Sequence, residues 1–127
     1  MPLNESDIRL PVFAVGTETD HVAPWRSVYK FNLLMETDVT FLLTNGGHNA
    51  GVISEPGAPV RHYRIATKLE HDRYSDPETW LQRAAMHEGS WWPEWVAWLA
   101  HRSGELVAAR TPSRGLMHAP GTYVLQP

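Results

Sequence analysis

Two apolar runs constrain what this chain can fold into more than any other feature of its sequence. Residues 10–15 (Leu-Pro-Val-Phe-Ala-Val) and residues 39–44 (Val-Thr-Phe-Leu-Leu-Thr) are almost entirely apolar, and each is followed closely by glycine. Strands that are apolar on both faces are typical of parallel sheets covered by helices. Residues 24–35, between the two runs, carry apolar side chains at helical spacing after a proline suited to a first turn. The sequence therefore predicts a strand–helix–strand unit with parallel strands, and so an α/β fold.

Two apolar parallel strands do not make a stable sheet by themselves, because at least one of them leaves an unpaired apolar edge. We therefore expect the sheet to be incomplete on its own, and another strand to pair with residues 10–15. That strand belongs either to a larger sheet of which this chain is a piece, or to a second molecule.

The rest of the chain predicts an edge strand and two helices. Residues 61–67 alternate between apolar and polar side chains, as an edge strand does. An Asp-Pro pair predicts a helix over residues 76–86, and a later proline opens a helix over residues 93–101. Residues 1–103 therefore form one predicted domain. Residues 104–127 form a Pro-, Gly- and Ala-rich tail that ends in a short strand-like segment.

An acid and a histidine follow the two apolar runs. Asp20 lies in Gly-Thr-Glu-Thr-Asp-His after the first run, and His48 lies in Asn-Gly-Gly-His-Asn-Ala-Gly after the second. The carboxyl ends of parallel strands meet at one edge of a sheet, where α/β proteins bind ligands. The order Asp then His is that of the α/β-hydrolase triad, in which the acid orients the histidine and the histidine acts as the base. Two other interpretations remain open. In one, Asp20 is an acidic residue that stabilises the N-terminus of the helix that follows it; in the other, His48 is a solvent-exposed loop residue.

Other candidate groups carry weaker signals. His21, beside Asp20, either supports the site from behind the acid or is an ordinary loop residue. The remaining histidines show no paired-ligand spacing, so we expect no metal site. No phosphate-cradling glycine-rich loop is present, and we expect no bound cofactor. Four of the six tryptophans cluster in residues 91–98. A sugar- or polymer-stacking platform is one interpretation, but their helical spacing favours packing into the core.

Composition narrows the class of protein. The chain has 127 residues, 43% hydrophobic and 20% charged, which fits one soluble globular domain. Its formal net charge of −3, without a basic stripe, argues against a nucleic-acid partner. No apolar stretch is long enough for a membrane span and no signal peptide is visible. The lack of cysteine fits a cytosolic protein, and a cytoplasmic location is expected. The chain has no cysteine, and no serine in a G-x-S-x-G context, so the third member of a triad is missing.

Four motifs together resemble a known family. They are Val-Gly-Thr-Glu-Thr-Asp-His-Val-Ala-Pro-Trp, Asn-Gly-Gly-His-Asn-Ala-Gly-Val-Ile-Ser, Glu-Gly-Ser-Trp-Trp-Pro-Glu-Trp and Ala-Pro-Gly-Thr-Tyr-Val, and they extend over nearly the whole chain. In these motifs the chain resembles the C-terminal part of a poly(3-hydroxyalkanoate) synthase, a member of the α/β-hydrolase superfamily. The resemblance implies the C-terminal portion of an α/β-hydrolase fold.

The resemblance also implies a function. Such synthases are acyltransferases that polymerise 3-hydroxyacyl-CoA into polyester, release CoA, and act as homo-oligomers on cytoplasmic polyester granules. Their catalytic triad is Cys–His–Asp; by motif, Asp20 matches the acid, His48 the base, and His21 a histidine that accompanies the acid. CoA is part of the substrate rather than a cofactor. The partner implied for this chain is a Cys-bearing N-terminal part, without which it is expected to be inactive.

Two alternatives to a catalytic segment remain. One is a non-catalytic granule-associated or interaction protein derived from the synthase. The other is a small self-sufficient esterase, which the lack of a serine in an elbow context makes the weakest interpretation.

Overall fold

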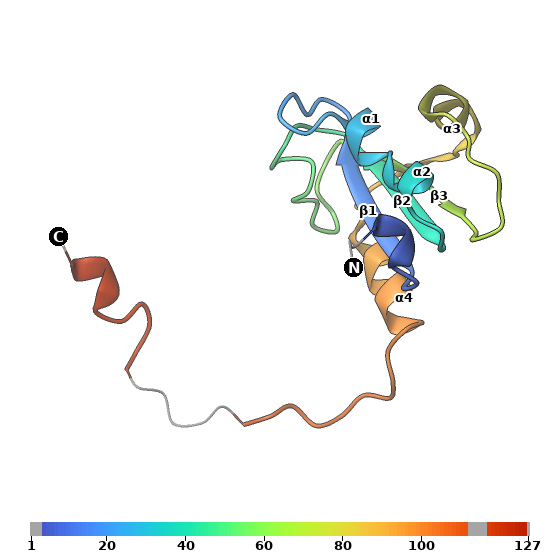
Figure 1. Ribbon diagram of the computed structural model, residues 1–127. Coiled ribbons are helices and arrows are strands. Elements are labelled where there is room, and N and C mark those ends of the chain that lie inside the picture. Colours follow the sequence, from blue (N-terminus) through green and yellow to red (C-terminus); the bar gives the residue numbers. More distant parts are fainter. Residues whose placement is uncertain (1–3, 112–116, 127) are drawn as a thin grey trace.

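A four-stranded mixed sheet with helices on both faces forms the body of the protein (Figure 1). The computed structural model describes residues 4–111 and 117–126. In chain order the elements are η1 (Glu5–Asp7), β1 (Val12–Thr17), α1 (Trp25–Val28), α2 (Phe31–Leu34), β2 (Val39–Thr44), β3 (His62–Lys68), α3 (Pro77–Arg83), β4 (Met86–Glu88), α4 (Trp92–Ala100) and η2 (Tyr123–Leu125). The α/β fold expected from the sequence is confirmed. No helix within the described ranges is long and apolar enough to cross a membrane.

The strands lie in the order β1-β2-β3-β4. β1 and β2 are parallel, in a register that pairs Val12 with Val39 and Thr17 with Thr44, so both strands end at the same edge. β3 runs antiparallel to β2, and β4 antiparallel to β3. β1 is an edge strand: within the described part of the chain its only neighbour is β2. The strand–helix–strand unit thus sits beside an open edge of the sheet.

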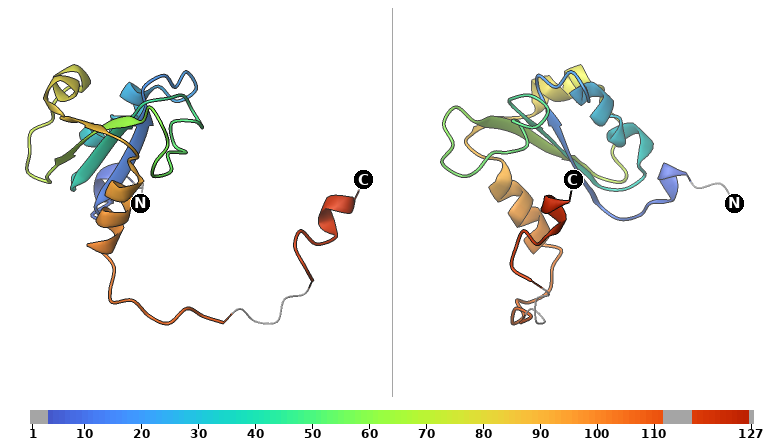
Figure 2. Two further views of the ribbon diagram at one scale, coloured as in Figure 1. Left: turned by 180° about the vertical axis from the view of Figure 1, so that it is seen from behind. Right: turned by 90° about the vertical axis from the view of Figure 1, so that its left-hand side faces the viewer.

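The sheet has a core on each face, and the helices divide between them. On one face α1 and α3 pack an aromatic cluster of Trp25, Tyr29, Phe41 and Trp80. On the other face the segment that starts α4 packs against β2 and β3. Figure 2 (right) shows α1, α2 and α3 on one side of the sheet and α4 on the other. Gly16 allows α1 to lie close to β1, because a Cβ there would meet the Trp25 Cβ at 3.0 Å.

The prediction of one helix over residues 24–35 is corrected by the structure: this segment forms the two short helices α1 and α2. Between the two helices the N–H groups of Lys30 and Asn32 bond to the carbonyls of Ser27 and Tyr29, three residues back, as in a 3-10 turn. This tightening lets both Tyr29 and Asn32 face the sheet, where both are buried. Core packing therefore overrides the regular helical repeat.

Two strand predictions are also corrected. The predicted edge strand over residues 61–67 is β3, which pairs with β2 on one side and over part of its length with β4 on the other. β4 exists because α3 ends at Arg83, short of residue 86, and the chain turns extended at Ala84. The tail segment predicted as strand-like forms η2 instead, with exposed side chains. A strand needs a hydrogen-bonded neighbour, and Figure 2 shows this segment far from the sheet.

The two later helices form where the sequence predicts them, although α3 ends before residue 86. α3 begins after Asp76, whose side chain accepts a hydrogen bond from the Thr79 N–H at 3.0 Å, with Pro77 in the first position. α4 matches the predicted range to within one residue. Its tryptophans are only partly in the core: Trp91 is buried, whereas Trp95 and Trp98 are half-buried. These two rings stack on each other, and each meets the ring of Phe13 of β1 at a steep angle, 60° for Trp95 and 70° for Trp98.

Candidate active site

Asp20 and His48 meet at the edge where β1 and β2 end. His48 Nδ1 lies 2.8 Å from Asp20 Oδ2. The two loops are joined by their backbones as they leave the sheet: the Glu18 N–H donates to the Thr44 carbonyl, and the Thr19 N–H to that of Gly46. The in-register parallel pairing of the strands is therefore what brings an acid and a histidine from distant parts of the sequence into contact.

The Asp20 carboxylate is held by its own loop. Its Oδ1 accepts hydrogen bonds from the backbone N–H groups of Val22 and Ala23, both at 2.8 Å, and its side chain is only 7% exposed. The Ala23 N–H above all, then His48 and the Val22 N–H, lower the pKa of Asp20 to about 2, against the opposing effect of burial. The carboxylate is therefore ionised at neutral pH and can only accept a hydrogen bond.

An ionised Asp20 sets the tautomer of His48. Because the carboxylate only accepts, Nδ1 of His48 carries the hydrogen, and in the neutral imidazole Nε2 then carries the lone pair. The His48 side chain is 48% exposed, and Nε2 makes no hydrogen bond with a described residue. This is the arrangement a general base needs: one ring nitrogen anchored and the other open to an incoming proton.

The pKa of Asp20 can be tested directly in the 127-residue chain. In a ¹³C NMR pH titration we expect its carboxyl to titrate at about 2 rather than at the ordinary 3.8. Because the folded-state pKa is the lower one, the stabilisation is complete above pH 3.8 and is lost as the pH falls toward 2. His48→Ala should raise the midpoint only in part, since both backbone N–H donors remain. The control is Asp76, whose pKa is lowered by hydrogen bonds from Thr79 and should not change in His48→Ala. A wild-type Asp20 midpoint near 3.8 would refute the hydrogen-bonded geometry.

Side chains from other parts of the protein hold residues 51–54, the segment that follows the His48 loop. The backbone carbonyls of residues 51–54 all accept hydrogen bonds from side-chain donors on two other segments. The donors, in order, are Trp91 Nε1 to Gly51 (3.3 Å), Trp92 Nε1 to Val52 (3.0 Å), Arg61 Nη2 to Ile53 (2.9 Å) and Ser90 Oγ to Ser54. We call residues 51–54 with these four donors the carbonyl clamp. It fixes the loop of the histidine to the start of α4 and to the residue before β3.

Gly51 brings the same loop down onto β1. A Cβ at Gly51 would lie 2.5 Å from Thr17 Cγ2 and 3.0 Å from the Asn45 carbonyl oxygen. Any side chain at this position therefore displaces the loop. Gly46, with φ +101°, makes the turn out of β2 that starts it. In the Gly-Gly-His-Asn-Ala-Gly motif, the first glycine is therefore required by the turn out of β2 and the last by the close contact with β1.

A second histidine–carboxylate pair lies at this edge, and sequence reasoning missed it. His62 Nε2 lies 3.4 Å from Glu18 Oε1. His62 begins β3, and because β3 is antiparallel to β2 its first residue reaches the edge where β2 ends. Only the antiparallel pairing reveals this. His21, in contrast, has an exposed side chain that makes no hydrogen bond to Asp20 or His48.

Comparison with known proteins agrees with the predicted resemblance. The chain is 40% identical over 129 residues to poly(3-hydroxyalkanoate) polymerase 2 of Ectopseudomonas oleovorans, a match that covers 98% of this chain and 22% of that protein. It is 35% identical over 129 residues to the poly(3-hydroxyalkanoate) polymerase subunit PhaC of Cupriavidus necator, covering 98% and 21%. The chain is a relative of the poly(3-hydroxyalkanoate) polymerases.

A third polymerase, from Methylorubrum extorquens, is 36% identical over 126 residues, which cover 96% of this chain and 20% of the relative. The chain thus spans about a fifth of the length of the curated polymerases it matches. This agrees with the C-terminal part of such a polymerase that the motifs indicate. No protein-family model matches the chain.

Proposed function

We propose that this chain is a segment of a poly(3-hydroxyalkanoate) synthase of the α/β-hydrolase superfamily, and that it supplies the acid and the base of the acyl-transfer site. The observation that carries the proposal is the 2.8 Å contact between His48 Nδ1 and Asp20 Oδ2 at the ends of two parallel strands. Its support comes from the ionised, anchored carboxylate and the free Nε2 of the histidine, in a chain related to these polymerases.

In the proposed reaction, Nε2 of His48 takes the proton of a cysteine thiol, and the thiolate attacks the thioester carbon of a 3-hydroxyacyl-CoA. The bond to the CoA sulfur breaks, and the imidazolium returns the proton to the leaving thiolate. His48 then takes the proton of a chain-end hydroxyl, whose oxygen attacks the acyl-cysteine. A new ester bond forms, and the departing cysteine recovers the proton. Asp20 holds the tautomer throughout. CoA enters within the substrate, so the reaction uses no separate cofactor.

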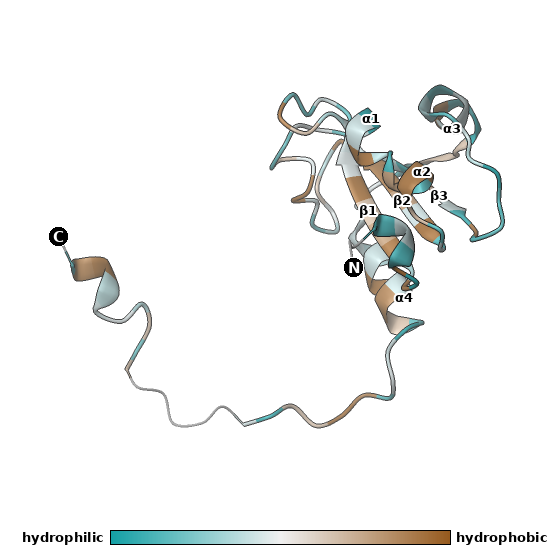
Figure 3. Ribbon diagram, in the orientation of Figure 1, coloured by the Kyte–Doolittle hydropathy of each residue, from teal (hydrophilic) through white to brown (hydrophobic). Residues whose placement is uncertain are grey.

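The proposal places the nucleophile on a Cys-bearing N-terminal part, since these 127 residues contain no cysteine. The free edge of β1 is the place where a further strand would pair. The residues before β1 and the outer face of α2 expose apolar side chains, and Figure 3 shows α2 in the brown of apolar residues. Such surface is what a larger protein buries. We propose that the complete synthase is a homo-oligomer in the cytoplasm, on polyester granules.

Reconstitution tests this function. The chain, joined to a Cys-bearing N-terminal part, is incubated with 3-hydroxybutyryl-CoA, and CoA release is followed with a thiol reagent. We expect release and polyester formation from the joined protein, and none from either part alone. Ester or thioester hydrolysis by the purified chain, or no release by a joined protein that folds, would contradict the proposal.

A granule-associated protein without catalysis is the second candidate. The observation that favours it is the exposed apolar surface on α2, where Phe31, Leu33 and Leu34 are each at least 39% exposed. Sedimentation of the chain with polyester granules, together with failure of the joined protein to release CoA, would select this candidate over the first.

The carbonyl clamp makes a separate prediction about activity. We expect the double variant Trp91→Phe, Trp92→Phe to lower kcat of the joined protein roughly tenfold with little change in KM. It keeps an aromatic ring at each position but removes the two indole N–H donors, worth about 0.5–1.5 kcal/mol each. Trp95→Phe is the matched control, since the Trp95 indole N–H has no hydrogen-bond partner among the described residues and its ring packs on the rings of Phe13 and Trp98. Equal kcat losses in both variants would show that the rings matter and the hydrogen bonds do not.

A further inference from the structure

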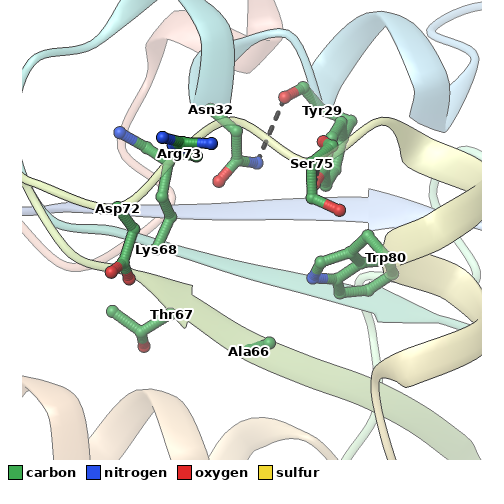
Figure 4. A pocket seen from close by; sticks show the side chains of 9 residues that line it. All are labelled: Tyr29, Asn32, Ala66, Thr67, Lys68, Asp72, Arg73, Ser75 and Trp80. Atoms are coloured by element: carbon green, nitrogen blue, oxygen red, sulfur yellow. Dashed lines mark hydrogen bonds between the residues drawn. The ribbon is translucent and has the colours of Figure 1, made fainter.

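A cavity of about 280 Å³ opens at the other end of the sheet from His48. β3 runs antiparallel to β2, so Lys68, near its end, pairs with Val39 at the start of β2. The cavity lies there, between the α1–α2 segment and the loop that leads to α3 (Figure 4). The residues that line it are Tyr29, Asn32, Ala66, Thr67, Lys68, Asp72, Arg73, Ser75 and Trp80. The proposed acyl-transfer reaction uses none of them.

Two largely buried residues each present a polar atom to this cavity. Asn32 is 5% exposed and Trp80 8% exposed. The Asn32 amide nitrogen donates to the Tyr29 carbonyl at 3.1 Å, but its amide oxygen and the indole N–H of Trp80 form no hydrogen bond with any residue in the described ranges. Figure 4 shows both atoms directed into the space between the two side chains. Because both atoms are open to the cavity and make no hydrogen bond with the described part of the protein, a bound ligand can use this donor and this acceptor.

The cavity carries one excess positive charge. Lys68 and Arg73 line it, opposed by the single carboxylate of Asp72. Lys68 Nζ donates to the Met35 carbonyl at 3.2 Å, and Asp72 accepts from the Leu69 N–H at 2.9 Å, so both are held in place. Arg73 makes no hydrogen bond with a described residue. A ligand with one negative charge neutralises this set.

The remaining wall is apolar. The rings of Tyr29 and Trp80 lie with centroids 5.6 Å apart, and Ala66 of β3 adds a methyl group. The Tyr29 hydroxyl already donates to the Ser75 carbonyl at 2.8 Å, so this ring offers mainly its face and edges. A small site with polar groups placed at a few points on an apolar wall is what small-molecule binding sites look like.

We propose that this cavity binds a small hydroxylated carboxylate. Its carboxylate lies at Lys68 and Arg73, its hydroxyl bonds the Asn32 oxygen and the Trp80 indole N–H, and its carbon chain packs on the Trp80 and Tyr29 rings. The site is a ligand site additional to the Asp20–His48 pair, and it does not depend on the proposed acyl-transfer function.

Titration of the 127-residue chain with 3-hydroxybutyrate tests the site. The readout is the indole N–H signal of Trp80 in ¹H–¹⁵N NMR spectra, assigned by its loss in Trp80→Phe. We expect a saturable shift of this signal with 3-hydroxybutyrate. Affinity should be weaker for butyrate, which lacks the hydroxyl, and for inorganic phosphate, which has no carbon chain to pack on the two rings.

Arg73 offers a second test, because its side chain is exposed and its substitution should leave folding intact. We expect Arg73→Gln to weaken 3-hydroxybutyrate binding roughly tenfold, because it removes a charge-assisted hydrogen bond. Arg83→Gln, an exposed arginine at the end of α3 outside the cavity, is the matched control and should leave the affinity unchanged. The proposal is overturned by the absence of a saturable shift, by tighter binding of phosphate, or by equal affinities of the two arginine variants.

Discussion

Replacing His48 by glutamine is expected to lower CoA release by the joined synthase by roughly 10³- to 10⁴-fold. Glutamine is close in size and still donates a hydrogen bond toward Asp20, but it has no group that takes a proton at neutral pH. Both thiol activation and hydroxyl activation therefore lose their base. The measurement is kcat/KM for CoA release from 3-hydroxybutyryl-CoA, with circular dichroism to show that the variant is folded.

Further variants distinguish the contribution of His48 to CoA release from the contributions of nearby residues. Asp20→Asn should lower CoA release by a comparable factor. The new amide can donate a hydrogen bond to Nδ1 of His48 and so favour the wrong imidazole tautomer. The double variant should cost little more than either single one, since the two residues act as a unit. His101→Gln, at the exposed end of α4, should keep the wild-type rate. His21→Gln should lose less than about a hundredfold, because an exposed histidine without a bond to the pair transfers no proton. Wild-type turnover by His48→Gln would end the catalytic assignment.

Gly51→Ala is expected to have the largest effect among the glycine substitutions. The new Cβ would lie 2.5 Å from Thr17 Cγ2, well inside the roughly 3.5–4.0 Å at which carbon atoms pack. We expect a loss of about 2 kcal/mol in the free energy of unfolding, measured by urea denaturation of the chain. Because relief of the clash moves the histidine loop by a fraction of an ångström or more, CoA release should fall by about 10²-fold.

The chain offers a matched control for this substitution. Gly104→Ala makes the same chemical change where nothing lies within 4 Å of the new Cβ, and it should change the unfolding free energy by less than about 0.5 kcal/mol. Thr17→Ser removes the methyl group that clashes and should restore part of the stability of Gly51→Ala. If Gly51→Ala is as stable as Gly104→Ala, the loop does not rest on β1 as described.

The parts of the fold that were predictable are those with a strong local signal. β1 and β2 follow from long apolar runs, and α3 from the Asp76-Pro77 start, because each depends on residues close together in the sequence. The split of the 24–35 helix and the pairing of β4 were not predictable. Both depend on which side chains the sheet buries, and a contact between distant segments leaves no local pattern.

The candidate site shows the same division. Asp20 and His48 could be found because parallel strands bring the loops at their carboxyl ends to one edge of the sheet. Their contact distance and the tautomer depend on the register of β1 against β2. The carbonyl clamp could not be found, although the Gly-Ser-Trp-Trp motif stood out, because nothing in that motif says where its indole N–H groups are directed.

The amino-acid sequence alone was enough to place an acid and a histidine after two neighbouring parallel strands, and to predict that no strand in the described part of the chain other than β2 pairs with β1. Those conclusions rest on hydrophobic periodicity and chain order, which are local properties. The anchoring of the histidine loop, the second histidine–carboxylate pair and the polar cavity at the far end of the sheet depended on the folded chain. Each combines groups from segments far apart in the sequence, and only the packing of β3, α3 and α4 on the sheet brings them together.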